Sequence, residues 1–163
     1  MGECKERCDI IIPVFNRLDL TKSCLKNIHD NTDSPFSLIL IDNASDSETK
    51  KFLVDFKSAN LNITLIRNED NLGWVKAVNQ GMKLTNGPYI CVMNNDTLVR
   101  TRDWLSELIE IAKSEPDIGL VNPCFKVKKE VMTDKPFIEI DFCRGYCILI
   151  KRVVIEKVGL FDE

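Results

Sequence analysis

Short apolar runs alternate with amphipathic segments over the first two thirds of the chain, and this alternation most restricts the folds open to it. The runs have the length and β-branched content of buried strands. The expected strands are residues 9–14, 36–42, 62–68 and 89–93. The expected helices are residues 18–31, 47–59, 74–84 and 101–114. Such alternation produces βαβ crossovers, so we predict an α/β fold with a mostly parallel central sheet and helices on both of its faces.

After Pro116 the pattern changes. Residues 119–125, 137–142 and 145–150 read as three short strands, and residues 151–160 read as a helix. This predicts a small mixed or antiparallel part attached to the parallel sheet. Because neither a repeat nor a flexible linker separates the two parts, we expect a single domain over residues 1–163.

Three of the expected strands end in segments that carry polar residues, at 13–16, 42–46 and 94–96. In open α/β sheets, ligands bind outside the carboxyl ends of the strands, so these segments predict a binding crevice. Neither a G-x-G-x-x-G nor a Walker phosphate loop occurs. A divalent cation on Asp96 would neutralise the phosphates of a bound nucleotide instead. The alternative is a plain turn in which Asn95 and Asp96 cap the next helix.

Composition excludes several functional classes. A net charge of -3 argues against nucleic acid as a partner, because that binding needs a basic face. His29 is the only histidine, which leaves little for a histidine triad or a zinc site. The 7 cysteines are an odd number without zinc-site spacing, so we expect reduced, buried thiols. No apolar run approaches a membrane span of roughly 18 residues, so we expect no transmembrane segment and a cytoplasmic protein, with peripheral association to the inner membrane face as a variant.

Several segments resemble, in order and spacing, the family-2 glycosyltransferases of the GT-A fold. They are DIIIPVFNR (9–17), LILIDNASD (38–46), NLGWVKAVNQG (71–81), YICVMNNDT (89–97) and FCRGYCILIKR with VGLFDE (142–163). The resemblance implies inverting transfer of a sugar from a nucleotide-diphosphate sugar to an acceptor hydroxyl, with Mn²⁺ or Mg²⁺ as cofactor. The acceptor would be a saccharide, a lipid-linked molecule or another hydroxyl compound. Residues 1–116 would form the nucleotide-binding half, and residues 117–163 the start of the acceptor-side half.

The resemblance also assigns residues. The nucleotide-binding residues would be Pro13, Phe15, Asn16, Asp42, Asn43, Asn71, Gly73, Asn79 and Asn95. Asp96 would hold the metal in a D-x-D-like element, and Gly145 and Tyr146 would shape the pocket for the transferred sugar and the acceptor. Asn43 stands where the family has a second acidic residue that reads the base, which leaves the base preference open. Trp74 and Trp104 are candidates for stacking on a sugar, but we expect a core or surface role for each.

The catalytic base of the family follows the stretch that VGLFDE matches, so we expect it beyond residue 163, in a chain truncated before it. Asp141 is a poor second candidate for the base, and Arg144 either approaches the diphosphate or stays solvated. Two other functions stay open. One is a non-catalytic module that binds a nucleotide or a saccharide. The other is a sugar nucleotidyltransferase, although the loop after the first strand lacks the glycines that such enzymes use. The sequence leaves the oligomeric state open.

Overall fold

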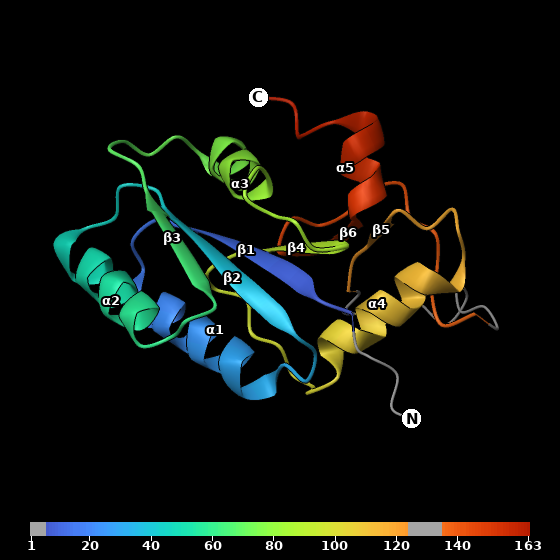
Figure 1. The fold of residues 1–163 in the computed structure, drawn as a ribbon, viewed down its shortest axis with the longest axis horizontal. Coiled ribbons are helices and arrows are strands. Elements are labelled where there is room, and N and C mark those ends of the chain that lie inside the picture. Colours follow the sequence, from blue (N-terminus) through green and yellow to red (C-terminus); the bar gives the residue numbers. More distant parts are fainter. Residues whose placement is uncertain (1–5, 124–134) are drawn as a thin grey trace.

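The computed structural model describes residues 6–123 and 135–163, which form one sheet with helices on both faces (Figure 1). The strands are β1 (Cys8–Val14), β2 (Phe36–Asp42), β3 (Ile63–Arg67), β4 (Tyr89–Met93), β5 (Leu120–Val121) and β6 (Cys147–Lys151). The helices are α1 (Leu18–Asn31), α2 (Ser47–Ser58), α3 (Trp74–Met82), α4 (Trp104–Ser114) and α5 (Arg152–Val158). Each element predicted for the first two thirds of the chain is therefore present.

The sheet has the strand order β3-β2-β1-β4-β6-β5. β1 runs parallel to both β2 and β4, and β3 runs parallel to β2. β6 is antiparallel to β4 and to β5. The predicted mixture of a parallel sheet with a small antiparallel part is thus confirmed, and the antiparallel strand pairs directly with the parallel sheet.

Side chains of successive residues in β1 enter two different cores, as the pleat of a strand requires. Ile10 and Ile12 pack with α1, α2 and α4 on one face. Ile11 packs with α3 and α5 on the other face. Figure 1 shows these two helical layers on opposite sides of the sheet. Burial on both faces explains why the parallel strands read as continuous apolar runs.

The strand predicted over residues 137–142 is wrong, because these residues have an irregular backbone. Ile140 and Phe142 are 50% and 69% exposed. β6 already pairs with β4 on one side and β5 on the other, so it offers no further edge to this segment. The strand predicted over residues 119–125 is shorter than expected, and Cys124 and Phe125 lie outside the described residues.

The cysteines agree with the expectation of reduced thiols where they are described. Cys8, Cys24, Cys91 and Cys147 are buried and unpaired, whereas Cys143 is partly exposed. Burial raises the pKa of the Cys8 thiol, which therefore stays protonated. Cys4 and Cys124 lie outside the described residues.

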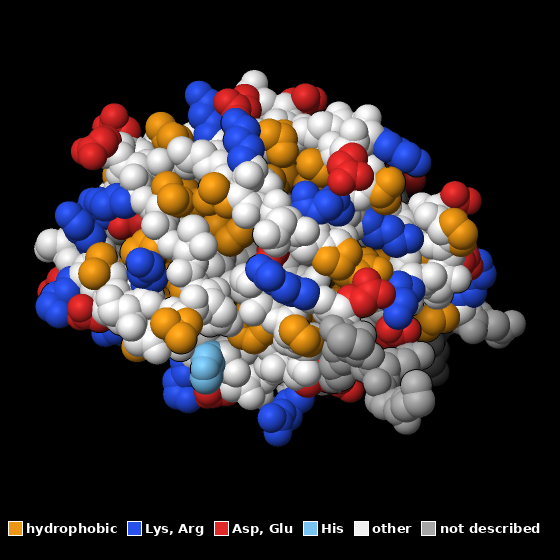
Figure 2. All heavy atoms as spheres, in the orientation of Figure 1, with side chains coloured by type: hydrophobic (Ala, Val, Ile, Leu, Met, Phe, Trp, Pro, Cys, Tyr) orange, Lys and Arg blue, Asp and Glu red, His pale blue; other side chains and the backbone are white. Residues whose placement is uncertain are grey.

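The surface carries charges of both signs. Figure 2 shows Lys and Arg side chains interspersed with Asp and Glu over the face that it draws. In the described part of the chain, no helix has the length and hydropathy needed to cross a membrane.

Gly81 sets the distance between α3 and β1. A Cβ atom at this position would lie 2.5 Å from the Cγ2 atom of Ile11, which is inside van der Waals contact. We expect Gly81→Ala to lower the free energy of unfolding by about 1–3 kcal/mol, since Ile11 is fully buried and has little room to move. Urea denaturation measures this change. Gly145→Ala is the matched control, because its nearest neighbour would be 4.0 Å away, and a loss of equal size there would contradict the packing explanation.

Candidate functional site

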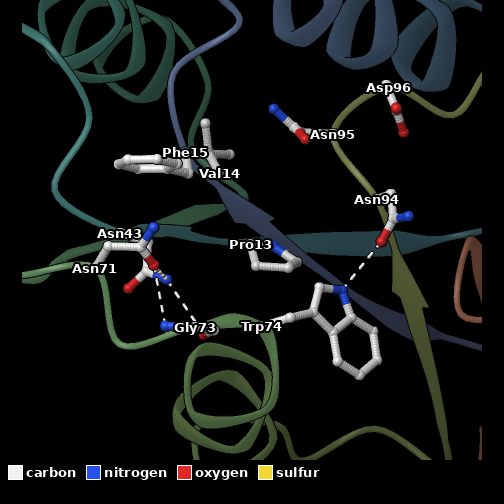
Figure 3. A pocket seen from close by; sticks show the side chains of 10 residues that line it. All are labelled: Pro13, Val14, Phe15, Asn43, Asn71, Gly73, Trp74, Asn94, Asn95 and Asp96. Atoms are coloured by element: carbon white, nitrogen blue, oxygen red, sulfur yellow. Dashed lines mark hydrogen bonds between the residues drawn. The ribbon is translucent and has the colours of Figure 1, made fainter.

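The polar strand ends meet at one pocket of about 320 Å³ at the carboxyl edge of the parallel strands (Figure 3). Its walls come from the ends of β1, β2 and β4 and from the loop that leads into α3. The lining residues are Pro13, Val14, Phe15, Asn43, Asn71, Gly73, Trp74, Asn94, Asn95 and Asp96. The crevice predicted from the three polar segments is therefore present.

The loops after β1 and β2 are tied together beside this pocket. The backbone N–H of Asn16 donates to the Ser45 hydroxyl at 2.9 Å, and the N–H of Asp46 donates to Asn16 Oδ1 at 2.7 Å. Asn16 and Ala44 both have left-handed backbones, with φ of 56° and 65°. Residues other than glycine adopt this conformation uncommonly, although asparagine does so more often than most, and such residues cluster at functional sites. Asn16 thus supports the neighbouring Phe15 and does not itself line the pocket.

Asp42 lies beneath the site and does not line it. Its side chain is 2% exposed and forms an ion pair with the guanidinium of Arg67. Its Oδ1 atom accepts a hydrogen bond of 2.9 Å from the N–H of Ser45, and Arg67 donates a second bond to the Ser45 carbonyl at 3.0 Å. The contacts of Asp42 therefore fix the turn after β2.

Asn43 holds the loop between β3 and α3. Its Nδ2 group donates to Asn71 Oδ1 at 2.7 Å and to the carbonyl of Gly73 at 3.2 Å. Its Oδ1 atom accepts from Asn68 Nδ2 at 3.0 Å and from the N–H of Leu72 at 3.1 Å. These contacts use both donors and both acceptor positions of the amide. Because the two backbone partners fix which way the amide faces, an acidic residue could not make the same set of bonds.

We expect Asn43→Asp to lower the free energy of unfolding by about 1–3 kcal/mol, because a carboxylate oxygen would face the Gly73 carbonyl where a donor now stands. Faster hydrogen exchange at the amides of residues 68–73 should accompany the loss. Asn62→Asp is the control, since Asn62 is exposed and donates one bond at the opposite edge of the sheet. Unchanged exchange in residues 68–73 of the Asn43 variant would contradict this account.

Three neighbouring side chains in the loop after β4 differ in their hydrogen-bond partners. Asn94 Oδ1 accepts a bond of 3.0 Å from the indole N–H of Trp74. Asn95 Nδ2 donates to the buried hydroxyl of Thr21 at 2.9 Å. Asp96 is exposed at the pocket, and no hydrogen bond or ion pair reaches its carboxylate from the described residues. The position of Asp96 leaves its charge available to a ligand.

The backbone of this loop is held from beneath. The Tyr146 carbonyl accepts bonds from the N–H of Asn94 at 3.1 Å and from the hydroxyl of Thr97 at 2.9 Å. The Cys24 thiol contacts the Asn94 carbonyl at 3.6 Å. Burial raises the pKa of Cys24 to about 12, so the thiol keeps the proton that it donates.

Besides Asn16 and Asp42, the predicted site residues Asn79, Gly145 and Tyr146 also lie outside the pocket lining. Asn79 is 2% exposed on α3 and binds the backbone of Phe161, donating to its carbonyl at 2.9 Å and accepting from its N–H at 3.1 Å. The Tyr146 hydroxyl donates to the carbonyl of Pro123. Gly145 lies closer, because a Cβ atom there would be 4.0 Å from the Trp74 ring.

Val14, Asn94 and Trp74 line the pocket although none of them was named as a site residue from the sequence; Val14 and Asn94 do lie within the strand-end segments predicted to form the crevice. Each adjoins an assigned residue, which is the signal that was available for finding them. Trp74 differs from Trp104, which is 7% exposed and bonds to Thr32, as expected of a core tryptophan.

The pocket can hold a divalent cation only if a bound ligand supplies further oxygen atoms. Among the described residues, no cluster of three or more His, Cys, Asp or Glu side chains could hold a metal. Asp96 supplies one carboxylate at the lining, to which residues 6–123 and 135–163 provide no hydrogen bond or ion pair. Mg²⁺ and similar hard cations commonly combine one or two carboxylates with phosphate oxygens and water. The donor set therefore fits a cation that arrives with a phosphorylated ligand.

The chain matches the family described as Glycosyl transferase family 2 over residues 9–159. It is 25% identical over 112 residues to an uncharacterized glycosyltransferase of Haemophilus influenzae, covering 69% of this chain and 36% of that protein. It is also 25% identical over 176 residues to the poly-beta-1,6-N-acetyl-D-glucosamine synthase of Staphylococcus aureus, covering 96% of this chain and 42% of that one. The chain thus spans less than half the length of these relatives.

Two solved structures share the fold. The mannosyltransferase PcManGT of Pyrobaculum calidifontis, in complex with GDP-Man and Mn²⁺, superposes with a TM-score of 0.79 at 21% identity, covering 97% of this chain and 48% of that one. Residues 1–349 of S. aureus TarS superpose with a TM-score of 0.72 at 16% identity, covering 96% and 50%. These similarities confirm the predicted GT-A architecture.

Proposed function

The chain belongs to glycosyl transferase family 2, and from this premise we propose that it binds the nucleotide-diphosphate sugar donor of an inverting glycosyltransferase. One observation supports this proposal most strongly. The ends of β1, β2 and β4 converge on a pocket that combines an exposed aromatic ring with a carboxylate that pairs with none of the described residues. Such a pocket offers an apolar surface for a base and a charge for a metal-bound diphosphate.

The nucleobase would lie against Phe15. This ring is 46% exposed at the pocket lining, where a core phenylalanine would be buried. Figure 3 draws the Asn71 amide between the Phe15 ring and Gly73. Since Oδ1 of Asn71 already accepts bonds from Asn43 and Gly73, its amino group is the part left to donate to a ligand. Asn43, with its hydrogen bonds used within the protein, would position this loop.

The diphosphate would lie between the start of α3 and Asp96. Gly73 and Trp74 begin α3 at the pocket, and the N-terminus of a helix favours negative charge. Asp96 would hold the divalent cation, with Asn95 beside it. When bound, such a cation stabilises the negative charge that develops on a departing diphosphate.

The reaction that we propose replaces one bond at the anomeric carbon with another. The acceptor oxygen forms a bond to this carbon on the face opposite the diphosphate, and the bond from the carbon to the diphosphate oxygen breaks. The hydroxyl proton passes to a carboxylate base. We assign this base to none of the residues that line the pocket.

Calorimetric titration with UDP, dTDP, GDP and CDP, each with and without Mn²⁺, tests the proposal. We expect one of the four to bind in a Mn²⁺-dependent manner. Binding of none would contradict the proposal. Release of nucleoside diphosphate from the matching sugar nucleotide would then separate an enzyme from a module that only binds.

A further inference from the structure

Trp74 is the one tryptophan that lines the pocket in the described part of the chain. It is the first residue of α3, is only partly buried and lines the pocket. Its indole N–H is bonded to Asn94 at 3.0 Å, so the ring is fixed relative to the loop that carries Asp96. Figure 3 shows the indole beside Pro13 and below Asn94. A flat apolar surface is therefore held in place between the β1 and β4 ends.

A second contact, with Phe161, also holds the ring. The Phe161 ring stacks on it, with centroids 5.8 Å apart and planes 30° apart. Phe161 is itself fixed by the two hydrogen bonds between its backbone and Asn79, five residues after Trp74 on the same helix. Stacking of Phe161 covers one face of the indole and leaves the other as the surface that the pocket can use. Residues 79, 161, 74 and 94 thus form a continuous chain of contacts.

The place of Trp74 in the pocket indicates what it would contact. Phe15 and Asn71 lie at one end of the pocket, and Asn95 and Asp96 lie at another (Figure 3). A base at the first end and a diphosphate beside Asp96 leave the region of Trp74 and Gly145 for the group attached to the diphosphate. A hexose ring presents a face of C–H groups, and such faces pack well against aromatic rings.

We propose that Trp74 forms the floor of the sugar subsite, with the C–H face of the donor's hexosyl group packed on its indole. This proposal rests on the proposed function. Asn94 and Phe161 act as positioning residues, because their contacts with Trp74 set the orientation of the ring. The same chemistry would suit a sugar of the acceptor, and the experiment separates these two sources.

Fluorescence gives a direct readout, because the chain has 2 tryptophans. Trp104→Phe leaves Trp74 as the only one, and Trp104 is buried in α4, away from the pocket lining. In this variant, we expect a sugar nucleotide to change the Trp74 emission, and the nucleoside diphosphate alone to change it much less. Free monosaccharide or oligosaccharide at millimolar concentration should have little effect. An emission change produced by free saccharide instead would overturn the donor assignment.

The second part of the test compares the affinities of Trp74 variants for the sugar nucleotide and for the nucleoside diphosphate. We expect Trp74→Leu to weaken binding of the sugar nucleotide roughly tenfold and that of the nucleoside diphosphate by less than about twofold. Trp74→Phe should lie between the parent and Trp74→Leu, and Phe161→Leu should reduce the emission change that depends on the sugar. If the diphosphate binds normally and these differences are absent, the Trp74 assignment alone is wrong. If no nucleoside diphosphate binds to the parent chain, the proposed function fails and this inference fails with it.

Discussion

Asp96→Ala should remove Mn²⁺-dependent binding of the nucleoside diphosphate, with affinity falling about 100-fold, which corresponds to about 2.7 kcal/mol. The reason is the position of Asp96, which gives the pocket a carboxylate without a partner among the described residues. Because the described part of the chain has no cluster of metal ligands, the cation would then keep only phosphate and water oxygens. Titration calorimetry with and without Mn²⁺ measures the loss.

The fold should tolerate this change, because Asp96 is exposed and contributes little packing. We expect the free energy of unfolding to stay within about 0.5 kcal/mol of the parent. Asp117→Ala is the matched control, since Asp117 is an exposed carboxylate away from the pocket lining. Equal binding by the parent and the Asp96 variant in the presence of Mn²⁺ would show that the metal assignment is wrong.

Arg67→Leu should lower the free energy of unfolding more than Asp96→Ala does. Its guanidinium neutralises the Asp42 carboxylate, whose side chain is 2% exposed, whereas the Arg67 side chain is 35% exposed. Removing one partner leaves a buried charge unpaired, which typically costs about 3–5 kcal/mol. Because solvent reaches the arginine, we expect a smaller loss of roughly 2–3 kcal/mol in the free energy of unfolding. Urea denaturation measures it.

Two further variants identify the source of that loss. Arg100→Leu removes an exposed arginine for which the described residues offer no ion pair, so it should change stability by less than about 0.5 kcal/mol. Adding Asp42→Asn to Arg67→Leu removes the unpaired charge and should recover part of the loss. No recovery in the double variant would contradict the role given to the Asp42 carboxylate.

The sequence predicted the parallel sheet well, because the burial of β1, β2 and β4 on both faces leaves a strong apolar signal in each of these strands. It predicted the antiparallel part less well. The apolar and polar alternation in residues 137–142 has the period of a strand, but pairing depends on a free edge that β6 does not provide. Periodicity describes a segment alone, whereas a strand needs a neighbour.

The sequence predicted which strand ends form the site, but not how each side chain there is oriented. Position after a strand places a residue at the carboxyl edge, and Phe15, Asn43 and Asp96 do line the pocket. Position does not reveal which way a side chain faces. Asn79 contacts Phe161, which is 82 residues away in the sequence, and this pairing has no local signal. The sequence did not reveal the place of Trp74 in the pocket for a related reason, because its partners Asn94 and Phe161 are distant in the sequence.

The central claim is that a nucleoside diphosphate binds at the carboxyl edge of the parallel strands. ¹H–¹⁵N correlation spectra of the labelled chain, recorded during titration with UDP, dTDP, GDP and CDP in the presence of Mg²⁺, test it most directly. A second pocket at the opposite edge, lined by residues that include Arg7, Asp9, Leu61 and Leu84, serves as an internal control. We predict that resonances of residues 15–16, 43–45, 71–74 and 94–97 shift. Shifts confined to the opposite pocket, or no shifts with any of the four nucleotides, would contradict the account.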